Sequence, residues 1–114
     1  MAAPSHDSAV SERMESFLTY LLAEWRAIPE LAQEWAEWSE AERLDYASDW
    51  AIREDRLLEV TAAAQQGRLT PGQQQRYVQV QRLVAQHRPL LDRLFHEAGL
   101  PLSSPQGATL PPAK

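Results

Sequence analysis

Glu54 and His87 are the two side chains whose type and position best suit acid–base or ligand chemistry. Glu54 falls among apolar residues at helical spacing, and a buried carboxylate without a partner is costly. If their segments pair as antiparallel helices, His87 comes within about one helical turn of the same height. We therefore predict a Glu54–His87 contact that fixes register rather than catalyses. Alternatively, Glu54 reaches solvent beside Arg43 or Arg53, and His87 has a backbone or water partner.

Asp45 and Asp49 form the other pair of carboxylates, four residues apart with Glu42 one turn earlier. Paired carboxylates can perform acid–base catalysis when a site positions them. These three fall opposite the apolar residues of their segment, so the pattern predicts a solvated face and at most a docking patch.

Metal binding has little support in the sequence. The carboxylate-bridged di-iron bundles need Glu-x-x-His on two helices, and this pattern does not occur here. The histidines stand at His6, His87 and His96, a spacing that does not make a convincing set of metal ligands. We predict no metal site.

Nucleophilic and cofactor chemistry are equally unsupported. The chain has no cysteine, and no serine stands in a suggestive relation to a histidine and a carboxylate. Four glycines, none in a phosphate-binding loop, give no cradle for a cofactor. We therefore predict a protein that is not an enzyme and binds no cofactor.

Three amphipathic segments must position these residues. The first has apolar residues at alternating steps of four and three, a helical stripe. Its members are Met14, Leu18, Leu21, Trp25, Ile28, Ala32 and Trp35. Pro29 lies inside the stripe, so the helix kinks there or restarts with proline in its first turn.

The second segment begins with the capping-box pattern of Ser39 and Glu42 and ends at Gly67. Its predicted apolar arc is Leu44, Tyr46, Ala47, Trp50, Ala51, Leu57, Leu58 and Ala62, and its polar face carries Asp45, Asp49, Arg56 and Glu59. This division predicts an amphipathic helix whose arc faces the core.

The third segment repeats the start signal with Thr70 and Gln73 and ends at Gly99. Its apolar stripe is Tyr77, Val80, Val84, His87, Leu91, Leu94 and Ala98. The prediction is a flexible N-terminal extension over 1–10, a helical domain over 11–99 and a disordered tail rich in proline and serine over 100–114.

Short connections make sequential helices antiparallel neighbours. The predicted fold is all-α, an antiparallel up-down-up three-helix bundle with kinks near Pro29 and Pro89. Its elongated shape makes a dimer plausible. Both prolines fall at one level, where freed carbonyls and small side chains open a candidate groove. The groove residues are Trp25, Trp50, His87 and Glu54. The simpler interpretation is that the prolines only let long helices bend.

A half-exposed aromatic flank is the predicted contact surface, because exposed aromatics mark interfaces. Its residues are Phe17, Tyr20, Leu31 and Trp38. The net charge is −5 and basic residues do not cluster, which disfavours direct nucleic-acid binding. No membrane span or secretory signal is expected, and the lack of cysteine fits the cytoplasm.

By elimination, the sequence favours a non-catalytic helical interaction module: a small adaptor, regulator or assembly subunit that docks a protein partner or a second copy of itself. Two alternatives remain. One is a small-ligand binder or sensor using the groove. The other is an acidic, antitoxin-like inhibitor that masks a basic site through Glu42, Asp45, Asp49 and Glu59.

Overall fold

The fold is all-α, as predicted, in a computed structural model that describes residues 6–100, with side chains from residue 8 onward. The helices are α1 (His6–Arg26), α2 (Ile28–Glu34), the single 3-10 turn η1 (Trp35–Glu37), α3 (Glu40–Gln65) and α4 (Pro71–Glu97). No strand occurs over 6–100. Helix α1 begins inside the predicted N-terminal extension, and nearly all of the predicted tail lies outside the described residues.

The two long helices α3 and α4 start at the capping boxes that the sequence predicts. The Glu42 amide donates to Ser39 Oγ (3.1 Å), and the Ser39 amide donates to Glu42 Oε1 (2.8 Å). Thr70 and Gln73 make the same reciprocal pair at 3.1 and 3.0 Å. Each box satisfies two amides that a helix N-terminus leaves without carbonyl partners.

The first predicted helix is interrupted at Ala27, which separates α1 from α2. Pro29 falls in the first turn of α2, where a missing amide hydrogen costs nothing. A continuous helix would instead lose the bond to the Trp25 carbonyl. Pro89, by contrast, lies within α4, which runs unbroken to Glu97.

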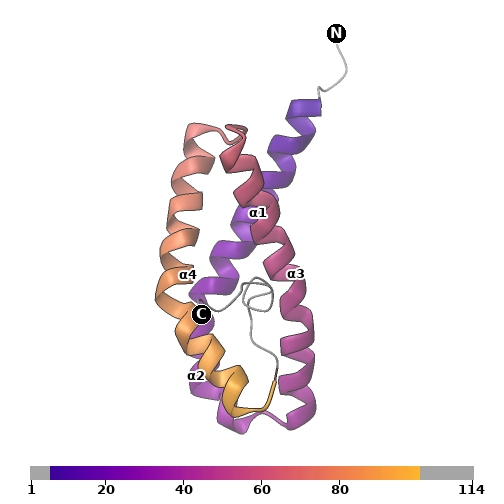
Figure 1. Cartoon of the computed structure of the whole chain (residues 1–114), viewed down its shortest axis with the longest axis vertical. Coiled ribbons are helices and arrows are strands. Elements are labelled where there is room, and N and C mark those ends of the chain that lie inside the picture. The colour runs from indigo at the N-terminus through magenta and orange to yellow at the C-terminus, as the bar shows by residue number, and fades with distance from the viewer. Residues whose placement is uncertain (1–5, 101–114) are drawn as a thin grey trace, which may run out of the picture.

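Helix α1 makes most of the contacts between the long helices. It packs against both α4 and α3, and α2 continues against α4. Figure 1 shows α3 and α4 running in opposite directions and joined by a short turn, with α1 crossing α3 obliquely toward α4. The result is a long, flat molecule with extents of 54 × 37 × 21 Å.

The core forms along the predicted stripes of the first and third segments. From α1 through η1, the buried members of the predicted stripe are Met14, Leu18, Leu21, Trp25, Ile28 and Trp35. From α4, they are Tyr77, Val80, Leu91 and Leu94. The predicted stripes of these two segments do face the core. Their spacing was sufficient because each of these helices has a single apolar face.

The predicted core face of α3 is right in part: Trp50 is buried, and Tyr46, Ala47 and Leu57 pack against the core, but the other four predicted residues are exposed. Its buried residues are Trp50, Glu54, Val60 and Ala63. Leu44 and Leu58, which we expected in the core, are 52% and 43% exposed, and Ala51 and Ala62 are exposed as well. Apolar residues occupy most of the circumference of α3, so apolar spacing alone does not select its inner face.

Candidate interaction surface

Glu54 is buried and paired, as its place in the sequence predicts, but its partner is Arg88 and not His87. The carboxylate is 2% exposed. Arg88 donates from Nη1 to Oε2 at 2.6 Å and from Nη2 to Oε1 at 3.0 Å. The predicted heights of residues on paired helices are accurate to about one helical turn, which includes both His87 and Arg88. Arg88 offers a positive charge and two hydrogen-bond donors to the carboxylate.

Trp50 completes the surroundings of this carboxylate, since its Nε1 donates to Glu54 Oε2 at 2.6 Å. The Arg88 guanidinium lies over the Trp25 ring, 5.0 Å from its centroid. Trp25 and Trp50 meet edge to face at 5.1 Å. Because both carboxylate oxygens are occupied and shielded from solvent, Glu54 is not placed to act as a general base on a substrate.

The predicted groove residues therefore lie mainly in the core. Trp25 and Trp50 are each 1% exposed, and His87 is half-buried. Both Pro29 and Pro89 are exposed. The two indole rings instead pack against each other in the core.

The adjacent residue Arg53 joins α3 to α1 in a second ion pair, with Nε 2.7 Å from Glu24 Oε1. Its guanidinium also lies 5.1 Å from the ring centroids of Tyr46 and Trp50. Burial raises the pKa of the Tyr46 hydroxyl well above its usual range, with the Arg53 charge opposing that shift. The Tyr46 ring itself packs against Trp35, Trp38, Trp50 and Phe95.

The aromatic residues predicted as a contact surface line the seam between α1 and α3. Phe17 is half-buried beneath Arg13 and Arg56, whose guanidinium carbons lie 4.9 and 5.3 Å from its centroid. Tyr20 is covered by Arg56 at 4.5 Å and Arg53 at 5.9 Å. Their rings are thus largely engaged within the chain.

The other two predicted contact residues are also packed internally. Leu31 is only 7% exposed, because α2 turns after Ala27 and packs against α4. Trp38 is half-buried and contacts Trp35 and Tyr46 at centroid distances of 5.6 and 5.7 Å. The structure thus places the predicted surface largely in intramolecular contacts, with Leu31 in the core.

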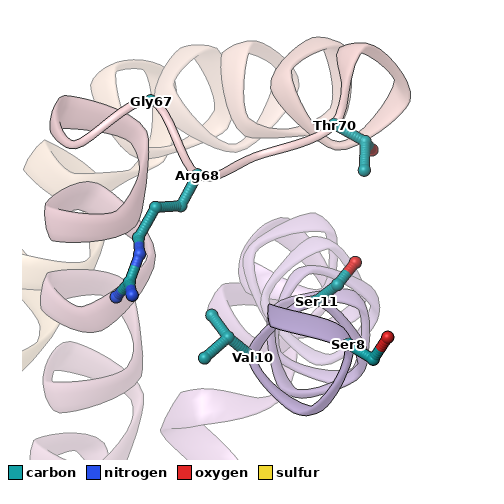
Figure 2. Close-up of a pocket in the computed structure, with 6 residues that line it drawn as sticks. All are labelled: Ser8, Val10, Ser11, Gly67, Arg68 and Thr70. Carbon is teal, nitrogen blue, oxygen red and sulfur yellow. The ribbon is translucent and has the colours of Figure 1, made fainter. Parts of the chain in front are cut away.

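A hollow of about 420 Å³ lies between the start of α1 and the α3–α4 turn. Its lining is Ser8, Val10, Ser11, Gly67, Arg68 and Thr70 (Figure 2). Figure 2 shows the Arg68 side chain directed toward α3, whereas the Ser8 and Ser11 side chains point away from Arg68. Ser11 and Thr70 already accept hydrogen bonds from Gln73. The polar groups do not converge as a ligand site requires.

A second, more apolar groove of about 280 Å³ separates α3 from α4. It is lined by Leu57, Thr61, Tyr77, Gln81, Val84 and Ala85. The groove is shallow, and α3 and α4 contact each other less than α1 contacts either of them. No charged side chain lines the groove.

The outward face of α3 has the largest exposed apolar side chains on the described part of the chain: Leu44, Ile52 and Leu58 are 52%, 49% and 43% exposed. Exposed residues continue the face along the helix at alternating steps of three and four, the spacing of a coiled-coil seam. We call this set the outer stripe: Ala41, Leu44, Ser48, Ala51, Asp55, Leu58 and Ala62, with Ile52 beside it.

The outer stripe is visible in the sequence, where we assigned half of it to the core. The helix has apolar residues on two of its sides, and only one side can face the core. A second apolar side is therefore the sequence signal for an exposed apolar face. Leu44, Ala51 and Leu58 recur every seven residues, whereas the inner face contains two adjacent charged residues, Arg53 and Glu54.

Over the part of the chain that the structure describes, no group of three or more histidine or carboxylate side chains is arranged to hold a metal ion. In the same range, no helix combines the length and apolar character of a membrane span. Comparison of the chain with protein-family models, curated proteins and solved structures finds no match.

Proposed function

We propose that this protein is a non-catalytic helical interaction module, a small adaptor, regulator or assembly subunit, and that it docks through the outer stripe of α3. The observation that carries this proposal is the exposure of Leu44, Ile52 and Leu58 on one side of one helix. Exposed apolar residues that gather on one surface mark contact sites, whereas scattered ones need no explanation. Here they gather.

The state of the titratable groups supports a non-catalytic role. Glu54, the best candidate for a general base, is held by Arg88 and Trp50 and shielded from solvent. Binding is the activity that the remaining surface favours.

We propose α1, α3 and α4 as the up-down-up bundle that presents this surface, with a cytoplasmic protein as the partner. The absence of cysteine fits a reducing compartment. A net charge of −5 without a basic cluster favours protein over nucleic acid.

The acidic-inhibitor alternative receives less support from the contacts. Glu42, Asp45, Asp49 and Glu59 are all exposed on α3. Two of them are already engaged: Glu42 accepts the Ser39 amide, and Glu59 lies 3.0 Å from Arg13. A basic site would therefore meet an acidic face with half its carboxylates bound internally.

Site-specific photo-crosslinking in the native cell tests the proposal. A photoreactive phenylalanine analogue replaces Leu44, Ile52 or Leu58 in separate variants, and Gln79 or Gln86 on the exposed face of α4 in matched controls. We expect discrete covalent adducts from the three α3 positions and none from the controls. Equal labelling at all five positions, or none at the three on α3, would contradict docking through this surface.

A further inference from the structure

We propose that the outer stripe of α3 binds the same stripe of a second copy of this chain, antiparallel, about a two-fold axis at Ala51. This inference rests on the proposed function, since it names the occupant of the same surface. A two-fold dimer requires a patch that is complementary to itself.

The apolar residues of the stripe meet this requirement. Leu44 and Leu58 lie seven residues from Ala51 in opposite directions. In an antiparallel pair, residues equally far from the axis on opposite sides share one height, so Leu44 faces Leu58 of the second copy. The same symmetry places Ala41 of each copy near Ala62 of the other.

Small residues at the centre allow the helices to approach closely. Ala51 lies on the axis, and Ser48 is the next stripe residue toward the N-terminus. Interaxial distances of about 8 Å require such short side chains at the contact. From Ala41 to Ala62 the stripe is about 32 Å long at 1.5 Å per residue, enough for a continuous helix–helix seam.

The polar residues also pair in this arrangement. Ser48 and Asp55 lie at nearly equal distances on either side of Ala51, so each Ser48 hydroxyl can donate to Asp55 of the second copy.

A parallel pair lacks this complementarity. It would set every residue opposite itself, which places two Asp55 carboxylates together at the centre of an apolar seam. Like charges at the contact disfavour that arrangement. Antiparallel packing is therefore the geometry that the sequence of the face selects.

Disulfide trapping tests both the partner and the direction, because the chain has no cysteine of its own. Ala51→Cys should give a covalent dimer on mild oxidation. Leu44→Cys or Leu58→Cys alone should give none, because two copies of either site would be about 21 Å apart, far beyond the roughly 7 Å limit between bonded cysteine Cα atoms. An equimolar mixture of these two variants should give the mixed dimer. The exposed α4 control Gln86→Cys should stay monomeric.

Sedimentation measures the strength of the same contact in the full chain. We expect Leu44→Glu/Leu58→Glu to weaken self-association by about 100-fold. Gln79→Glu/Gln86→Glu adds the same charge to α4 and should leave it unchanged. All four positions are exposed, so neither pair disturbs the core.

Two results would overturn the dimer. One is a monomer at all concentrations together with no covalent dimer of the Ala51→Cys variant, and the other is efficient trapping of Leu44→Cys with itself. If photo-crosslinking at Leu44 and Leu58 still yields an adduct with a different protein, the interaction module stands and only the second copy is refuted. If neither experiment detects a partner, both proposals fail.

Discussion

Replacing Arg88 with methionine isolates the energetic role of the buried ion pair. The substitution removes two charge-assisted hydrogen bonds from Glu54 and leaves a carboxylate that is 2% exposed with Trp50 as its remaining donor. Methionine keeps much of the apolar stem that packs over Trp25. The change therefore tests the lost charge and donors more than lost volume.

The expected cost of Arg88→Met is about 3–5 kcal/mol, the usual result of leaving one partner of a buried pair alone. Glu54→Gln should cost less, about 1–2 kcal/mol, for two reasons. The glutamine carbonyl still accepts the Trp50 indole hydrogen. The Arg88 side chain is 19% exposed, so its charge has access to water.

The double variant Glu54→Gln/Arg88→Met supplies the decisive comparison. It strands no charge, so its cost should be at least about 2 kcal/mol below the sum of the two single costs. Urea unfolding followed by far-ultraviolet circular dichroism measures each value, with an unchanged dependence on denaturant as the check for two-state behaviour. Arg93→Met, the same substitution at an exposed position on α4, should stay within about 0.5 kcal/mol of the parent chain.

Additivity would refute this reasoning. If the double variant loses the sum of the single costs, or if Arg88→Met costs under about 1 kcal/mol, the pair does not stabilise the fold. The rotation of α3 would then depend on apolar packing alone.

Three further measurements follow from local contacts. Ser39→Ala and Thr70→Ala should each cost about 1 kcal/mol in urea unfolding, because each removes one acceptor of a capping box. In an alkaline titration of phenolate absorbance, Tyr46→Phe should remove the last step, since burial raises the pKa of that hydroxyl. The contribution of Tyr46 to stability is complete below the unfolded pKa of about 10 and is lost as pH rises further, so the phenylalanine variant should resist alkali better. Hydrogen bonds from Gln73 and Arg76 lower the pKa of Glu15 below its usual value, and Gln73→Met should raise it again in an NMR titration. The support that Glu15 gives is present at neutral pH and disappears on acidification.

Features that depend on neighbouring residues could be predicted from the sequence. Both capping boxes and the glycine helix ends at Gly67 and Gly99 are local, and the structure contains them. The all-α class and the apolar stripes of α1 and α4 follow from periodicity, because those helices each have one apolar side. The burial of Glu54 was also predictable from its apolar neighbours.

Features that depend on the rotation of one helix against another were beyond these rules. A register estimate accurate to one turn does not distinguish His87 from Arg88, although their side chains point in directions about 100° apart. Leu44 and Leu58 were assigned to the core because apolar spacing does not select between two apolar sides of α3. The arginine side chains from α3 that lie over Phe17 and Tyr20 were not predicted, because such contacts leave no periodic pattern.

The adjacent residues Arg53 and Glu54 explain why the outer stripe faces outward. Arg53 pairs with Glu24 on α1, and Glu54 pairs with Arg88 on α4, so α3 is tied to both neighbouring helices by two charges one residue apart. Apolar burial alone would accept either apolar side of α3. Any large rotation that buried Leu44 and Leu58 would break both ion pairs and strand at least one charge in the core. The core pairs thus determine which apolar face remains exposed, and the proposed contact surface is a consequence of that choice.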